Sequence, residues 1–321
     1  MTNLLSLIGR RLVQLPVMIL GITFLVFYIM SFSQIDPAIT ALGEGASLEA
    51  RAAYRLAHGL DEPLLTRYVN FLGGLLQGDL GTYSARQLPV SDAVMAAFPI
   101  TLQLTFLGLI FAVIGALILG VVAAIWRDGW PDQVIRIVSI ASLSTPSFWL
   151  AMLLIQLLGH RVGVFSLLPT SGPLPAMTDN FSGWFLRMLL PAFALAVPVI
   201  GQLSRVVRTA MVEELDRDYV RTALGAGIPR RVVVARNVLR NALITPITVL
   251  GLRIGYLMGG AVIIEIIFNI NGMGMLILNG VTNNEPNLVQ GVTLTVALAF
   301  VVINIIVDLL YVLVNPRIRS V

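Results

Sequence analysis

One arginine-rich stretch, EELDRDYVRTALGAGIPRRVVVARNVLRNALITP (residues 213–246), separates two long apolar regions of the sequence. Apolar side chains keep helical spacing between residues 220 and 224, a Gly-Ile-Pro break follows at 227–229, and a second helical pattern runs from 230 to 243. The stretch therefore predicts a helix, a turn and a second helix that leave an apolar environment and return to it.

The apolar regions are too extensive for a soluble protein. Of the 321 residues, 57% are hydrophobic and 12% are charged, and the mean hydropathy is +0.89. Apolar residues make up only about half of an ordinary soluble domain. We therefore expect an all-α polytopic membrane protein. The sequence has no cysteine, which excludes disulfides, thiolate metal sites and thiol catalysis.

Six transmembrane helices are predicted within a single membrane domain that covers residues 1–321. Each apolar stretch is long enough to cross a hydrocarbon core of about 30 Å. The predicted spans lie at about 12–33, 99–126, 136–159, 185–208, 244–268 and 288–314. Two other segments complete the chain, an outer insertion at 34–98 and the helix-turn-helix at 211–243.

The arginines indicate the orientation in the membrane. All 21 basic residues are arginine and lie mostly at the ends of apolar runs, which favours a topological role over nucleic-acid binding despite the net charge of +4. Cytoplasmic segments are enriched in basic residues. With both termini in the cytoplasm, six arginines face outward, Arg253 lies within the membrane, and 14 face inward: residues 10, 11, 127, 136, 205, 208, 217, 221, 230, 231, 236, 240, 317 and 319.

The outer insertion is acidic and punctuated by glycine. Ser47 is expected to cap a helix that ends near His58, and a second helix is expected from Asp61 to about Gln77, with a glycine after each. This segment therefore predicts a small, partly helical extracytoplasmic layer.

Several polar residues within the spans are candidates for a path through the membrane. Pro146 removes a backbone donor from the third span, so a kink is predicted there. Ser142 and Thr145 beside it either line a path or satisfy the freed carbonyl groups. Arg253 in the fifth span either meets an anionic group or pairs with a neighbour, because charge within a bilayer is costly. Gln202 in the fourth span is the remaining candidate.

The polar stretch carries a resemblance to a known family. Arg221-Thr222-Ala223, followed after three residues by Gly227, resembles the EAA loop through which membrane subunits of ATP-binding-cassette importers dock on their ATPases. Arg221 stands where that family has Glu, and Thr222 where it has Ala. The continuation RNVLRNALITP (236–246) is similar to the form of this loop in the dipeptide and oligopeptide permease family.

Other segments are similar to the same permease family. The outer stretch HGLDEPLLTRYVNFLGGLLQGDLGTY (58–83) contains Gly78-Asp79-Leu80-Gly81, a recurring signature there. Further similar segments lie at 269–274, 286–291 and 315–318. The resemblance thus covers nearly the whole chain.

This resemblance implies a function and a set of partners. The chain would be the first-type permease of an ATP-driven importer of di- or oligopeptides in the cytoplasmic membrane of a bacterium. Its partners would be a second permease, two ATPases, an extracytoplasmic substrate-binding protein and the lipid bilayer. ATP and magnesium would bind to the ATPases, with no cofactor in this chain. The residues that would couple to the ATPases are Arg221, Thr222, Ala223, Gly225, Gly227 and Pro229.

Alternatives stay open at this point. Relatives of this type also carry nickel complexes, glutathione or haem. A secondary transporter driven by an ion gradient would normally place charges near the middle of the membrane, where only Arg253 is predicted. The chain has no lysine and therefore no P-loop, and His58 and His160 both fall outside the predicted spans. We therefore expect no catalytic site, and a membrane scaffold or enzyme has little support.

Overall fold

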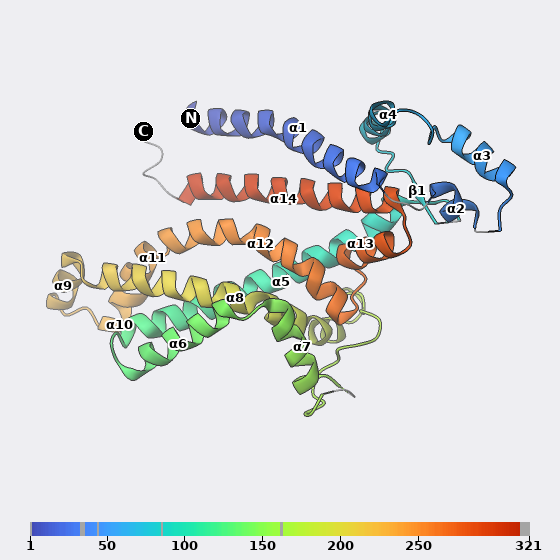
Figure 1. Cartoon of the computed structure of the whole chain (residues 1–321). Coiled ribbons are helices and arrows are strands. Elements are labelled where there is room, and N and C mark those ends of the chain that lie inside the picture. Colours follow the sequence, from blue (N-terminus) through green and yellow to red (C-terminus); the bar gives the residue numbers. More distant parts are fainter. Residues whose placement is uncertain (1, 33–35, 44, 85, 161–162, 315–321) are drawn as a thin grey trace. The chain divides into compact units, whose positions relative to one another are not determined.

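The computed structural model describes residues 2–32, 36–43, 45–84, 86–160 and 163–314, and most of this chain is helical (Figure 1). Within these residues the only strands are β1 (Thr82–Tyr83) and β2 (Leu88–Pro89), which pair in an antiparallel hairpin. The predicted all-α class is therefore confirmed. The motif at 315–318 and Arg161 lie outside the described residues.

The chain divides into two compact units. Unit 1 contains Met1–Leu4, Leu102–Asn269 and Ile303–Val321, and unit 2 contains Leu5–Thr101 and Ile270–Val302. The single domain predicted from the sequence thus has two parts. Helices α5 (Val90–Ile125) and α14 (Pro286–Val314) contribute residues to both.

Unit 2 contains the segment that the sequence predicts to lie outside the membrane. Besides parts of α5 and α14, its helices are α1 (Thr2–Ser31), α2 (Pro37–Leu42), α3 (Leu48–Ala57), α4 (Leu64–Leu76) and α13 (Met273–Thr282). The predicted cap of α3 is confirmed, because the Ser47 hydroxyl accepts a hydrogen bond from the Ala50 N–H at 3.2 Å. Helix α4 begins later than the predicted Asp61, since Pro63 disfavours helical geometry in the residue before it.

A small apolar core fixes the start of α5 in unit 2. Val90, Val94 and Ala97 pack with Met273 of α13 and with residues of α14. The Thr101 hydroxyl also accepts a buried hydrogen bond of 2.9 Å from the Met273 N–H. The helix therefore begins at Val90 and continues through Pro99, whereas the sequence predicted a start at 99.

Unit 1 is built around one long helix, α8 (Phe181–Leu215). Its other helices, besides parts of α5 and α14, are α6 (Trp130–Ser144), α7 (Ser147–Leu158), α9 (Asp218–Gly225), α10 (Arg230–Val232), the π-helix η1 (Val233–Val238), α11 (Leu239–Ala242) and α12 (Ile244–Phe268). Helices α6, α7 and α12 all pack against α8. A Cβ on Gly201 of α8 would lie 2.6 Å from the Ser139 carbonyl oxygen of α6, so glycine permits this close approach.

The third predicted span is broken rather than kinked. Helix α6 ends at Ser144, α7 starts at Ser147, and the two axes differ by 105°. Thr145 and Pro146 are both extended, with ψ of 117° and 135°. Proline disfavours helical geometry in the residue before it, and the chain here turns away instead of resuming the same axis. The kink predicted at Pro146 is therefore a break between two helices, and the single span at 136–159 stays a prediction.

Length and composition identify the helices that are able to cross a membrane. Among the described residues, three qualify alone: Val90–Ile125, Phe181–Leu215 and Pro286–Val307. The number rises to as many as six if each of three bent helix pairs is one span. The pairs are Trp130–Ser144 with Ser147–Leu158, Arg230–Ala242 with Ile244–Gly251, and Arg253–Phe268 with Met273–Thr282. The protein is therefore a multi-pass membrane protein.

Candidate functional site

A short amphipathic helix, α9, follows α8 at one end of unit 1 (Figure 1). Asp218 lies in its first turn, where the helix dipole favours negative charge. Val220 is buried, with 3% of its surface exposed, whereas Arg221 and Thr222 are exposed. The helix therefore presents one face to the protein and the other outward.

The predicted break after α9 is a Schellman motif. Gly227 has φ of 80°, the left-handed conformation that glycine adopts without strain. Its N–H donates to the Leu224 carbonyl at 3.0 Å, and the Ile228 N–H donates to the Ala223 carbonyl at 3.2 Å. Pro229 then precedes the first residue of α10. Gly227 thus reverses the chain through local hydrogen bonds.

The second helix contains a π-helical segment that the sequence did not reveal. Residues Arg230–Ala242 form α10, η1 and α11 in succession. Val233, Val234 and Val238 are all buried. These three valines therefore form the inward face of the segment.

These valines belong to an apolar cluster that joins the helix-turn-helix to α5 and α8. We refer to it as the valine cluster, and its buried members are Ala124, Val207, Ala210, Met211, Val220, Val233, Val234, Val238 and Ala242. Because both arms of the helix-turn-helix contribute side chains to it, the segment is packed on unit 1 rather than suspended as a flexible loop.

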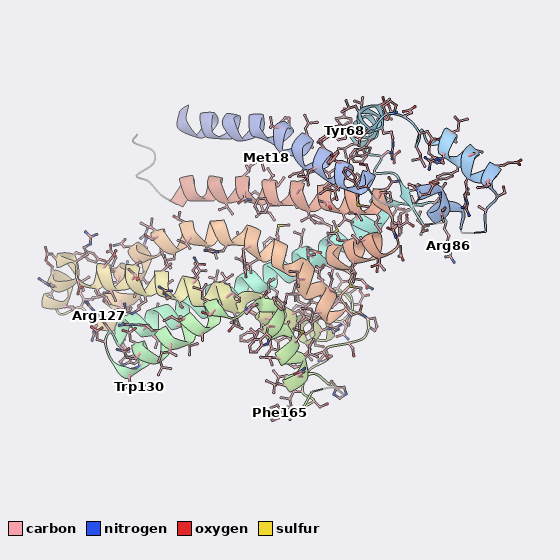
Figure 2. All side chains as sticks on the ribbon, viewed as in Figure 1. Met18, Tyr68, Arg86, Arg127, Trp130 and Phe165 are labelled. Atoms are coloured by element: carbon pink, nitrogen blue, oxygen red, sulfur yellow. The ribbon has the colours of Figure 1, made fainter. Side chains whose placement is uncertain are left out.

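Polar contacts reinforce the same junction. The Tyr219 hydroxyl donates to the Glu214 carboxylate at 2.7 Å, and burial raises the pKa of Tyr219, so the phenol stays protonated. Arg127, at the end of α5, donates to the Asp216 carboxylate at 2.9 Å. Figure 2 shows Arg127 near Trp130 at this end of unit 1. These bonds tie α5, α8 and α9 together.

The outer surface of the helix-turn-helix combines apolar and basic groups. The exposed fractions of Leu224, Ile228 and Val232 are 41%, 40% and 41%. The arginines at 221, 230 and 231 are also exposed. Large apolar side chains left exposed among charged residues are typical of a surface that a partner protein covers.

The structure brings the predicted coupling residues together on this segment. Arg221, Thr222, Gly225, Gly227 and Pro229 are exposed. Ala223 differs, because it is half-buried and packs against the valine cluster. Ala223 therefore contacts the chain's own core, and its role in coupling to a partner stays a prediction.

The predicted path residues do not form one site. Gln202 lines a cavity of about 420 Å³ in unit 1, together with Arg205 and Glu213, whereas the other three candidates do not line it. Ser142 packs beside Gly201 of α8. The Thr145 hydroxyl donates to the Ala141 carbonyl one turn earlier at 2.8 Å.

Arg253 is half-buried in α12. Its Nε is buried and has no hydrogen-bond partner among the described residues. A cation in this position is costly in a membrane protein, which keeps Arg253 a candidate for contact with an anionic group.

Arg187 is a buried residue that sequence reasoning missed. It lies on α8 with 2% of its surface exposed, and its Nη2 donates to the Phe268 carbonyl at the end of α12 at 2.6 Å. The arginine count placed it among the outward-facing cations. Its partner is 81 residues away in the sequence, so no local pattern could have indicated the contact.

Comparison with known proteins identifies the family. A family described as binding-protein-dependent transport system inner membrane component matches residues 116–320, and its N-terminal family matches residues 4–105. A protein of Brucella abortus, provisionally named a peptide transport system permease, is 37% identical over 315 residues, covering 98% of this chain and 99% of the relative.

Glutathione transport system permease proteins are similarly related. That of Pectobacterium atrosepticum is 36% identical over 310 residues, covering 97% of each chain, and that of Salmonella choleraesuis is 34% identical over 316 residues, covering 98% of this chain and 99% of the relative. The protein thus belongs to the family of binding-protein-dependent transport system inner membrane components, as a permease of the peptide type within the ATP-binding-cassette importers.

Proposed function

We propose that this permease imports di- or oligopeptides and that the helix-turn-helix at 211–243 couples it to ATPase subunits. The observation that carries this proposal is the segment itself, which is anchored by the valine cluster and exposes apolar and basic groups outward. A relative that is 37% identical is provisionally named a peptide transport permease, which supports peptides as the substrate class.

The proposed assembly has three kinds of protein partner. A second permease completes the transport path, two ATPases bind the exposed surface of the helix-turn-helix, and an extracytoplasmic protein delivers the substrate. ATP and magnesium bind to the ATPases, and this chain contributes no catalytic residue or cofactor. Both termini lie in the cytoplasm of a bacterium, and residues 34–98 lie outside its cytoplasmic membrane.

The proposed mechanism depends on rigid attachment. When the ATPases close, a force on α9 is transmitted through Val220 and the valine cluster to α8. Helix α8 packs against α6, α7 and α12, so it moves them with it. A rigid element of this kind is suited to alternating access.

We propose that Arg253, Gln202, Ser142 and Thr145 lie along the transport path. The strongest of these is Arg253, whose buried Nε lacks a hydrogen-bond partner among the described residues. Replacement by leucine should leave membrane insertion intact and reduce import. Normal import by Arg253→Leu would remove this residue from the path.

Glutathione is the second substrate candidate, because two related permeases are named glutathione transport system permease proteins.

One experiment tests both function and substrate. The chain is purified at native expression, co-purifying ATPases are identified, and the assembly is reconstituted in vesicles with its binding protein. Import of a labelled dipeptide that unlabelled dipeptide suppresses more strongly than glutathione supports the peptide assignment. A purified chain with no ATPase attached would refute the coupling function.

A further inference from the structure

Two adjoining cavities lie in unit 2. They are lined by residues from the end of α1, from α2 to α4, and from the turn between α13 and α14, with the β-hairpin closing the smaller one. Their volumes are about 270 Å³ and 190 Å³, and both are lined by Phe27, Arg67 and Gln290. Small-molecule sites typically enclose about 300–1,000 Å³, so the combined space suits a small ligand.

The glycine motif Gly78-Asp79-Leu80-Gly81 positions one wall of this space. Gly78 and Gly81 both have φ of 80°, and the Asp79 carboxylate accepts a hydrogen bond from the Gly81 N–H at 2.8 Å. A Cβ on Gly81 would lie 2.9 Å from the amide nitrogen of Asn287. Only glycine therefore lets the hairpin approach the start of α14.

This approach brings the hairpin to the carboxylate of Glu285. The Ser84 N–H donates to Glu285 Oε1 at 2.9 Å, and the Asn287 amide donates to the Thr82 carbonyl at 2.9 Å. Glu285 makes no ion pair with the described residues. Burial raises its pKa, as expected for a carboxylate without a nearby cation.

An unpaired cation lines the same space. The guanidinium of Arg67 on α4 lies over the Phe27 ring, 5.7 Å from its centroid, and makes no ion pair within the described part of the chain. Contact with the ring face leaves the N–H groups at its edge available. Among the described residues, Glu285 and Arg67 therefore leave one negative and one positive charge without an ion-pair partner.

The other charges around the cavities compensate each other. Asp36 and Arg55 line the larger cavity and form an ion pair of 2.8 Å, and Arg55 also pairs with Asp61. His58 in the smaller cavity stacks on Tyr54. The surplus charge is thus confined to Glu285 and Arg67.

We propose that this cavity binds a short peptide by its two charged ends, with the ammonium group at Glu285 and the carboxylate at Arg67. Gln290, which is 6% exposed and lines both cavities, supplies an amide for the peptide bond between the ends. This inference rests on the proposed function, because it assigns a binding site in this chain to the substrate class proposed above.

Diglycine is the probe for the site. It is titrated by calorimetry into the assembled importer in lipid nanodiscs, without ATP and without the binding protein. Saturable binding is expected, and N-acetyl-diglycine and diglycinamide should each bind at least about tenfold more weakly, because each loses a charged hydrogen-bonding end. Glycine and triglycine, titrated in the same way, define the length that spans the two charges.

Two variants connect this discrimination to the named residues. Glu285→Gln should no longer distinguish diglycine from its N-acetyl form, and Arg67→Gln should no longer distinguish it from the amide. Glu49→Gln and Arg86→Gln replace exposed charges outside the cavity and should bind like the wild type. Figure 2 shows Arg86 on the hairpin side of unit 2.

Three results would overturn the site. They are no measurable binding of diglycine, equal binding of the free and blocked peptides, or unchanged discrimination in both variants. Co-purification of the ATPases and dipeptide import by the same preparation are measured in parallel. If these persist, the cavity assignment alone is wrong and the proposed transport function stands.

Discussion

Arg208 on α8 binds the carboxylate of Asp132 on α6 through two hydrogen bonds of 2.6 Å each. Asp132 is fully buried, and Arg136 donates to the same carboxylate at 2.7 Å. The Asp128 N–H adds a further bond of 2.9 Å. This network fixes the start of α6 against the last third of α8, which is the end of α8 that carries the helix-turn-helix.

The first prediction concerns this pair. Arg208→Ala should lower the free energy of unfolding by about 3 kcal/mol, because it removes one partner of a buried ion pair. Arg205→Ala, which removes an exposed arginine of the same helix, serves as the control. Thermal unfolding of both variants in detergent provides the measurement. If the two variants are equally stable, Arg136 alone is enough to compensate the buried charge of Asp132.

The second prediction concerns docking of the ATPases. Gly225 is exposed and a Cβ there meets nothing within 4 Å, so Gly225→Trp should leave the fold intact. A bulky side chain on this surface should cost about 1–3 kcal/mol of interface packing and reduce both ATPase co-purification and peptide-stimulated ATP hydrolysis. Gly73→Trp on α4, where space is equally open, is the matched control.

Gly227 makes a poorer site for this test. Its φ of 80° means that any side chain would add about 1–2 kcal/mol of backbone strain. Wild-type coupling in Gly225→Trp would remove the assignment of this surface to the ATPases.

The third prediction separates anchoring from docking. Val238 is fully buried in the valine cluster, whereas Val232 is 41% exposed. Val238→Ala should destabilise the junction by about 2 kcal/mol and loosen coupling while the ATPases stay bound. Val232→Ala should instead weaken ATPase binding and leave thermal stability unchanged. The idea of a rigid transmission fails if Val238→Ala couples normally despite lower stability.

The fourth prediction tests orientation. The chain has no cysteine, so single cysteines report cleanly. Glu49 and Arg230 are both exposed, and an impermeant thiol reagent should label Glu49→Cys in intact cells but Arg230→Cys only after lysis. The reverse pattern would invert the proposed topology.

The fifth prediction concerns pH. Burial raises the pKa of Glu285 above its ordinary value, so the folded state binds this proton more tightly than the unfolded state. Above the pKa of Glu285 in the folded state, the buried carboxylate is ionised and lowers the stability of the fold. This loss of stability disappears as the pH falls through the pKa of the folded state towards that of the unfolded state. Glu285→Gln should therefore be more stable than the wild type at neutral pH, and this advantage should vanish in acid.

Glutamine retains an oxygen that accepts the Ser84 N–H, so this bond does not confound the comparison. The titratable groups that share the adjoining cavities are Asp36, Tyr54, Arg55, His58, Arg67 and Tyr83. Glu49→Gln is the control for a carboxylate on the surface. Parallel melting curves of Glu285→Gln and wild type between acid and neutral pH would contradict the prediction.

The sequence by itself determined the features that depend on local chemistry. Its apolar composition established a helical membrane protein, because water is absent from the bilayer and backbone groups must bond within each segment. The cap at Ser47 and the reversal at Gly227 were predictable for a similar reason, since both use hydrogen bonds between residues a few positions apart.

Only the tertiary structure decided whether a proline in an apolar stretch interrupts its helix. Pro99, Pro191 and Pro198 lie inside continuous helices, whereas the chain breaks by 105° at Pro146. Packing of neighbouring turns holds the helix at Pro99, and no local pattern encodes that support. The sequence also could not predict that Ala223 packs against the valine cluster or that Arg67 and Glu285 line one cavity. Both features depend on contacts between segments far apart in the chain.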